Sequence, residues 1–375
     1  MDGRPLRQGM AGDDVADLKQ RLAGIGTLAA EVASGQEFDE PTELAVRAFQ
    51  QARGLNVDGI AGPATLRALD ECTWQLGDRV LAYSPQDLMH GDDVAALQHR
   101  LLQLGFVVGR IDGIFGPGTA EALADFQTNV GLPGDGTAGP ATFKALHRLS
   151  PVVSGGRADV LRDHERLHVA GPRLSGKVVV VDPGHGGRDP GHRANGHVEA
   201  ELAYQLAQMV TERLSRGGVA AQLTRGPDDT LSDADRAAIA NDRQADLLVS
   251  LHFDAAPSPL PHGVASYYFG SVRHPVRSVV GERLADLVNR EIAARTGLLN
   301  GRSHPKTWDL LRFTAMSAVH LELGYLTNPQ DAAALRRASV LDGMADAIVV
   351  SVQRLYLPPE MDTQTGRLQL GSLLG

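Results

Sequence analysis

Cysteine is almost absent from this chain of 375 residues, which contains only Cys72. A single cysteine excludes an intramolecular disulfide and also a zinc site built from several thiolates. A metal ion must therefore be held by histidine and carboxylate side chains. Lysine is scarce beside many arginines, and together with abundant alanine and glycine this usage is typical of a GC-rich genome.

Long apolar runs are also missing, and no stretch of about 18 apolar residues could form a membrane span. The net charge of −9 gives no indication of binding to nucleic acid or to an anionic membrane. The first residues, MDGRPLRQGMAGDD, lack the apolar core of a secretory signal. We therefore expect a cytoplasmic protein, or an extracellular or cell-wall one if the chain is exported by another route.

The first 150 residues contain an internal repeat, which predicts two copies of one small domain. Residues 12–22 read GDDVADLKQRL, and residues 91–101 read GDDVAALQHRL. Later positions keep a constant offset of 77 residues (126 − 49), in the pairs Phe49 and Phe126, Gly54 and Gly131, Asp58 and Asp135, Gly62 and Gly139, and Leu69 and Leu146. Apolar residues recur at helical spacing, so we expect about three short helices in each copy.

The C-terminal half has a different pattern, in which strands alternate with helices. GKVVVVDPGH (176–185) and ADLLVSLHFDA (245–255) are continuous apolar strands, whereas 200–214 and 232–242 have helical spacing. The fold expected here is α/β, with a mostly parallel sheet covered by helices on both faces, preceded by two small three-helix all-α domains. The expected domains are 6–71 and 88–149 for the repeats, 150–174 for a linker, 175–357 for the α/β domain and 358–375 for a flexible tail.

Two of the buried strands run directly into a histidine, His185 in the first and His252 in the second. The carboxyl ends of parallel strands meet at one edge of a sheet, which would bring both imidazoles together. A catalytic zinc ion usually has three protein ligands and an open position for water. Glu199, at the start of the following helix, could supply the third ligand. Glu201 is a rival carboxylate, but it would point about 200° away on that helix.

A further acid, Glu322, lies in the apolar segment HLELGYLTN. It could act as the general base that takes a proton from water and returns it to a leaving amine. From the residues alone, each strand-end histidine is equally open to a purely structural role.

Residues 176–356 resemble the zinc-dependent N-acetylmuramoyl-L-alanine amidases of the Amidase_3 family. The resemblance is carried by DPGHGGRDPG (182–191), GHVEAELAYQLA (196–207), Arg236 and Asn241 of an R-x-x-x-x-N motif, ADLLVSLHFDA (245–255) and LELGYLTN (321–328). It implies that His185, Glu199 and His252 bind Zn²⁺ and that Glu322 is catalytic. Three positions depart from the family pattern: Phe253, Asp254 and Ala200.

The repeats resemble the peptidoglycan-binding domain type 1. The shared elements are GDDV-x-x-L, A-x-x-x-FQ-x-x-x-GL and DG-x-x-G-x-x-T. The second copy also has a glycine pair in DGIFGPGT (112–119), where the first has QEFDEPT (36–42). Ligand binding by the first copy is therefore left open, as is a purely scaffolding role for both.

Several other side chains are candidates around this constellation. Arg312 is a candidate for binding a substrate carboxylate with its guanidinium group, and His197 and Asp254 are candidates for contacting substrate. Asp182 is a candidate for orienting a ligand. His192 and His197 are expected to be exposed, and structural roles are expected for His262, His304 and His320.

The resemblance implies hydrolysis of the amide between N-acetylmuramic acid and L-alanine in peptidoglycan or muropeptides. Actinobacterial proteins with this arrangement include cytoplasmic members that resemble regulators of cell-wall precursor synthesis. A non-enzymatic regulator with a cell-wall synthesis protein as its partner is therefore the alternative, and action on cytoplasmic precursors or recycled muropeptides is a third possibility. No nucleic-acid partner is expected.

Overall fold

The structure is a computed structural model that describes residues 4–149, 171, 173–271, 276–357 and 364–368. The chain divides into two compact units, one within residues 1–161 and the other within residues 162–271 and 277–375. Most of the predicted linker (150–174) and of the predicted tail (358–375) lies outside the described residues.

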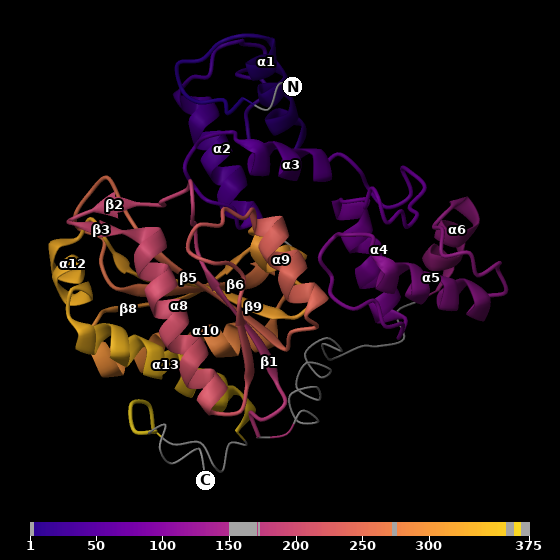
Figure 1. The fold of residues 1–375 in the computed structure, drawn as a ribbon. Coiled ribbons are helices and arrows are strands. Elements are labelled where there is room, and N and C mark those ends of the chain that lie inside the picture. Colours follow the sequence, from indigo (N-terminus) through magenta and orange to yellow (C-terminus); the bar gives the residue numbers. More distant parts are fainter. Residues whose placement is uncertain (1–3, 150–170, 172, 272–275, 358–363, 369–375) are drawn as a thin grey trace. The chain divides into compact units, whose positions relative to one another are not determined.

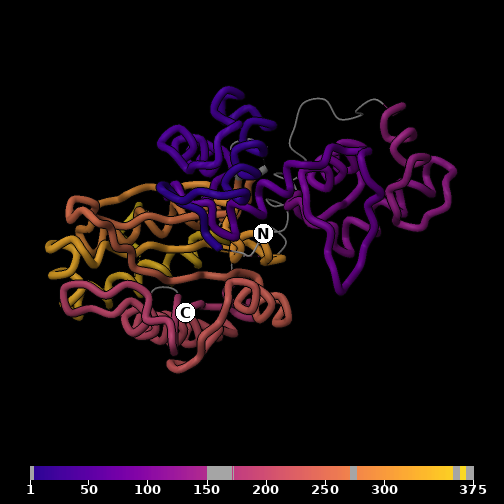
Figure 2. Tube along the Cα trace, turned by 90° about the horizontal axis from the view of Figure 1, so that it is seen from above, coloured from indigo at the N-terminus to yellow at the C-terminus, as the bar shows by residue number. Residues whose placement is uncertain are grey.

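The N-terminal unit is helical, as the repeat pattern predicts. Its helices are α1 (Asp13–Gly24), α2 (Glu40–Arg53), α3 (Pro63–Glu71), α4 (Asp92–Gln103), α5 (Pro117–Asn129) and α6 (Pro140–Arg148). Each repeat has its own hydrophobic core, centred on Phe38 and Phe49 in the first and on Phe115 and Phe126 in the second. In Figure 2 the first repeat is coloured indigo and the second purple.

A buried glutamine explains the D-G-x-x-G-x-x-T motif of the repeats. The Nε2 group of Gln98, on α4, donates to Asp112 (2.9 Å), to the Ile114 carbonyl (3.0 Å) and to Thr119 (3.0 Å). Its Oε1 accepts from the backbone N–H of Gly113 at 2.9 Å. One amide thus ties the turn to the helix that follows it. The same arrangement recurs with Gln50, Asp58 and Thr65, and with Gln127, Asp135 and Thr142.

Lys19 takes the place of this glutamine in the first repeat, where the glycine pair is missing. Its side chain is buried, and its Nζ donates to the Glu37 carbonyl (3.0 Å) and to Asp39 (3.3 Å). Asp39 in turn caps α2 by accepting from the backbone N–H of Thr42 at 3.1 Å. The segment QEFDEPT is therefore held by an ion pair and a helix cap instead of an amide.

The C-terminal unit contains one large sheet and a small hairpin. The large sheet has the strand order β4-β1-β5-β9-β6-β7, with β8 paired to β6. Its strands are β4 (Ala220–Leu223), β1 (Val178–Pro183), β5 (Leu247–Asp254), β9 (Ser317–Tyr325), β6 (Val264–Ser271), β7 (Val276–Arg277) and β8 (Asn300–Lys306). The pairs between β4, β1, β5 and β9 are parallel, and β6 is antiparallel to β9. The hairpin is β2 (Arg193–Ala194) with β3 (His197–Val198).

Alternate residues of the strands face two different environments, because side chains in a strand point to opposite faces. Leu251, Phe253 and Leu321 belong to the main hydrophobic core, which they share with α8 (Glu199–Arg216), α10 (Val279–Thr296) and α13 (Ala338–Tyr356). The intervening residues, among them His252 and Glu322, face the opposite side.

Helices also lie on that opposite side, where α11 (Asp309–Phe313) contacts β9 and packs on α9 (Asp233–Asp242). The short α12 (Pro329–Leu335) follows β9 (Figure 1). Among the described residues, none of the helices combines the length and the hydrophobicity that crossing a membrane requires. The α/β fold class expected from the sequence is confirmed.

We predict that Gln98→Ala destabilises the second repeat by about 1–3 kcal/mol, because several buried polar groups lose their partner. Gln103→Ala, on the same helix but half-buried, serves as the control and should cost less. Amide hydrogen exchange in α4 and α5 measures the difference. Equal protection in both variants would contradict a structural role for the buried amide.

Candidate metal centre

Three side chains from separate elements meet beyond the carboxyl ends of β1 and β5. His185 lies in the turn after β1, Glu199 is the first residue of α8, and His252 lies near the end of β5. Their ligand atoms all lie within 4.8 Å of one another, which makes the three a possible metal-binding group. The turn at His185 is tight, and this residue has a positive φ of 54°.

The distances between these atoms fit one small ion with imidazole and carboxylate ligands. Glu199 Oε1 lies 3.1 Å from His185 Nε2 and 3.0 Å from His252 Nδ1. Two ligand atoms on one tetrahedral zinc ion are about 3.3 Å apart, given zinc–ligand distances near 2 Å. The planes of the two imidazoles cross at 75°, so in-plane lone pairs of both rings can converge on one point.

A second group, formed by His252, His320 and Glu322, has equally close ligand atoms but a different geometry. The rings of His252 and His320 are stacked at 4.1 Å with an angle of only 19°. Because a ring nitrogen binds a metal in the plane of its ring, two rings stacked face to face do not direct their lone pairs at one point. His320 therefore packs on the candidate ligand His252 and does not complete the same ligand set.

Glycines give the ligand side chains room. A Cβ atom at Gly184 would lie 2.2–2.5 Å from atoms of the His252 ring. A Cβ atom at Gly191, whose φ is +62°, would lie 2.6 Å from Glu199 Oε2 and 2.7 Å from His185. These contacts explain why Gly184 and Gly191 of the DPGHGGRDPG segment cannot be replaced by residues with a side chain without displacing the site residues.

Two buried arginines fix the turn that carries His185. Arg236 donates to the carbonyls of Pro183 (2.8 Å) and His185 (2.7 Å). Arg225 donates to the carbonyls of Pro183 and Gly184, each at 2.8 Å. The backbone of the turn is thereby held by charge-assisted hydrogen bonds.

Asp182 balances the charge of Arg236 inside the protein. Its carboxylate accepts from Arg236, Thr224 and Ser250 at 2.5, 2.5 and 2.7 Å. Burial alone would raise the pKa of Asp182, but the arginine and the two hydroxyl groups lower it below its ordinary value. Asp182 thus holds Arg236 in the position from which it fixes the turn.

Glu199 is held as an ionised carboxylate. Its Oε1 also accepts from the backbone N–H of Phe253 (3.2 Å), and its Oε2 accepts from that of His192 (2.9 Å). Burial would raise the pKa of Glu199, but hydrogen bonds from His185 and His252 lower it well below its ordinary value. The charged form is the one that a metal ion requires.

Glu322 lies beside this group on the neighbouring strand, where it is paired in register with His252. Its Oε1 is 2.9 Å from His320 Nε2, whereas its Oε2 is buried and has no hydrogen-bond partner among the described residues. Burial raises the pKa of Glu322 to about 8, and burial lowers the pKa of His320 to about 4. The pair combines a carboxyl group that readily holds a proton with a neutral imidazole.

Comparison with known proteins gives this arrangement a family. Residues 179–354 match the Amidase_3 family, described as N-acetylmuramoyl-L-alanine amidase, and residues 11–69 and 90–146 match a family of peptidoglycan binding domains. The chain is 42% identical over 385 residues to the N-acetylmuramoyl-L-alanine amidase CwlM of Mycobacterium tuberculosis, a match that covers all of this chain and 95% of that protein. The chain belongs to the N-acetylmuramoyl-L-alanine amidase family.

Other amidases match about half of this chain. The amidase LytC of Bacillus subtilis is 31% identical over 173 residues, which is 46% of this chain and 34% of that protein. The solved amidase AmiC2 of Nostoc punctiforme is 29% identical and covers 48% of this chain and 96% of that chain, with a TM-score of 0.44.

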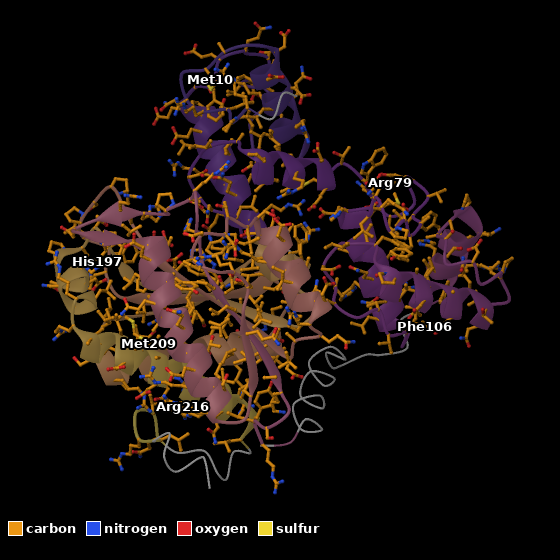
Figure 3. The ribbon with its side chains drawn as sticks, in the orientation of Figure 1. Met10, Arg79, Phe106, His197, Met209 and Arg216 are labelled. Atoms are coloured by element: carbon orange, nitrogen blue, oxygen red, sulfur yellow. The ribbon has the colours of Figure 1, made fainter. Side chains whose placement is uncertain are left out.

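The three candidates for substrate contact, Arg312, Asp254 and His197, are all half-buried. Arg312 is half-buried on α11, and Asp254 is half-buried at the end of β5. His197, labelled in Figure 3, is half-buried rather than exposed as expected. Its Nε2 lies 2.9 Å from the Ala332 carbonyl. This contact ties the small hairpin to α12. A substrate contact by these three residues stays a prediction.

One of the three departures from the family pattern, Phe253, directs its side chain away from the site. This side chain belongs to the hydrophobic core, and the backbone N–H of Phe253 donates to Glu199. Glu201, the rival carboxylate, is exposed on α8.

Three sets of contacts at the site were not predicted from the sequence. His320, for which a structural role was expected, contacts both His252 and Glu322. Asp189 lies 2.7 Å from His185 Nδ1, and Arg225 holds the turn. The two-residue spacing of His320 and Glu322 on a strand was a signal that they share a face.

We predict that Asp189→Asn weakens binding of added Zn²⁺ about 10–100-fold, because a carboxylate on the far nitrogen orients a metal-binding imidazole. Asp242→Asn, at the exposed end of α9, is the matched control. Competition with a chromogenic chelator measures both affinities. Equal affinities would rule out Asp189 as the orienting group of His185.

Proposed function

We propose that this amidase is a zinc-dependent hydrolase that cleaves the amide between N-acetylmuramic acid and L-alanine in peptidoglycan or muropeptides. The observation that carries the proposal is the convergence of His185, Glu199 and His252 beside Glu322, whose buried Oε2 has no hydrogen-bond partner among the residues that the structure describes. Family membership over the same residues supports the choice of substrate.

Zinc is the metal that the ligand set favours. Two imidazoles and one carboxylate form a three-ligand set of the kind found in catalytic zinc sites, and no thiolate is available. A zinc ion held there would polarise the amide carbonyl and lower the pKa of a bound water molecule to about 7.

Glu322 has the position and the chemistry of the general base. Its Oε2 has no hydrogen-bond partner within the described part of the chain, and it faces the side of the sheet that carries His252. In the proposed reaction this carboxylate takes a proton from the attacking water. It then returns that proton to the leaving nitrogen of L-alanine as the C–N bond breaks.

His320 positions this base. When Glu322 is ionised, its Oε1 accepts a hydrogen bond, so Nε2 of the neutral His320 must be the donor. This contact leaves Oε2 as the oxygen that exchanges the proton. Two rings limit movement of the His320 imidazole: the stacked ring of His252, and the ring of Trp308, whose centroid lies 4.7 Å from that of His320.

The repeats are proposed to bring the amidase domain to its polymeric substrate. A non-enzymatic regulator is not favoured, because the proposed ligands and the proposed base are all present. A cytoplasmic location stays a prediction that cell fractionation can test.

We predict that Glu322→Gln lowers kcat for a soluble muramoyl peptide by about 10²–10⁴-fold while bound zinc stays stoichiometric. The amide side chain keeps the shape of glutamate but cannot accept the proton. Release of the L-alanine amino group, followed by amine labelling, measures the rate.

The exposed Glu201→Gln is the control and should keep wild-type activity. Removal of metal with a chelator should abolish hydrolysis, and Zn²⁺ should restore it. A wild-type chain with a full zinc complement that cleaves no amide would refute the proposed function.

We predict that His320→Leu lowers kcat about tenfold or more, because a hydrogen bond to a charged group is lost. KM and zinc affinity should change little, and His320→Gln should recover part of the rate through its amide N–H. In the Glu322→Gln background, His320→Leu should have no further effect. An equal loss in that background would show that His320 does not act through Glu322.

A further inference from the structure

The second repeat contains a surface pocket of about 590 Å³ between α4 and α6. Its apolar lining includes Ile111, Phe143 and Leu146. Its polar lining includes His99, Arg100 and His147. A volume in this range and a mostly apolar wall with a few polar groups are typical of sites for small ligands.

The first repeat provides an internal comparison, because the same helices recur there. Residues of α4 lie 79 positions after those of α1 (91 − 12), so Ala96 and Arg100 correspond to Asp17 and Arg21. Residues of α6 lie 77 positions after those of α3, so His147 corresponds to Asp70.

In the first repeat an ion pair bridges the two helices at this place. The Arg21 guanidinium on α1 pairs with Asp70 on α3 and lies 3.7 Å from Asp17. A side chain of one helix thus reaches across to the other, and its charge is balanced by carboxylates.

In the second repeat both carboxylates are replaced, and the partners of the corresponding arginine among the described residues are neutral. Arg100 donates to the Leu146 carbonyl (2.9 Å), to the Leu149 carbonyl and to the side-chain oxygen of Gln103 (3.4 Å). A carbonyl orients a guanidinium group without neutralising it. The pocket therefore combines a positive charge, two imidazoles and an apolar wall.

We propose that this pocket binds the peptide stem of the wall polymer through one of its free carboxylates, and that the first repeat lacks such a site. The inference rests on the proposed function and deepens it, since it assigns peptide recognition to one of the two repeats. A carboxylate of the peptide faces Arg100 and the imidazole N–H groups, as charge complementarity requires. Alanyl methyl groups of the stem lie against Phe143 and Ile111.

The test exchanges the two surfaces in the full-length chain, in the Glu322→Gln background, where hydrolysis is blocked. Ala96→Asp with His147→Asp restores the carboxylates of the first repeat and closes the pocket. Binding of a free alanine- and glutamate-containing stem peptide is measured by isothermal titration calorimetry. We expect loss of one binding site, or at least a tenfold weaker Kd for it.

The reciprocal variant, Asp17→Ala with Asp70→His, opens the first repeat and should add a site. It keeps the proposal falsifiable if the closed variant does not fold, which circular dichroism reports. Val107→Asp with Asn129→Asp adds two carboxylates to exposed positions of the second repeat and controls for net charge. This control should bind as the parent does.

Unchanged stoichiometry and affinity in both exchange variants would overturn the proposal. Hydrolysis of a soluble muramoyl peptide by the wild-type chain is measured in parallel. If the wild type hydrolyses this peptide but neither exchange alters peptide binding, the pocket assignment fails and the proposed function stands. If peptide binding follows the exchange but no hydrolysis occurs, the pocket assignment stands and the proposed function fails.

Discussion

The arrangement of the site depends on the hydrogen bonds that the buried carboxylate of Asp182 accepts. It joins the end of β1 to Thr224 after β4, to Ser250 on β5 and to Arg236 on α9. A buried ion pair is tolerated only when its remaining hydrogen-bonding groups are satisfied, and here they are satisfied by the carbonyls of the turn itself. Arg236 therefore both neutralises the buried charge of Asp182 and fixes the backbone of the His185 turn.

The geometry of the proposed metal centre follows from this support. His185 is fixed through its backbone, Glu199 through two backbone N–H groups and His252 through its strand. The three proposed ligands come from different elements, and each is held in place by its own hydrogen bonds or strand pairing. Such positioning is what keeps a ligand set ready for a metal ion.

Much of this arrangement was predictable from the sequence, because strand periodicity and strand ends determine where a side chain points. His185, His252 and Glu322 were identified in that way, and the family resemblance selected Glu199. The interactions that were missed are those that depend on approach in three dimensions. Arg225 comes from a loop that sequence periodicity does not describe, and its bond to Gly184 exists only once the sheet is assembled. His320 was within reach of prediction, since it precedes Glu322 by two residues.

The alternation along β5 has a consequence for how this protein can change. His252 belongs to the proposed metal centre, and the next residue, Phe253, belongs to the hydrophobic core. Insertion or deletion of one residue before this point would exchange the two side chains between faces. Phenylalanine would then enter the site, and an imidazole would be buried among aliphatic side chains. The strand can therefore accept substitutions but not shifts in length, so the spacing of the motif should outlast the identity of its other residues.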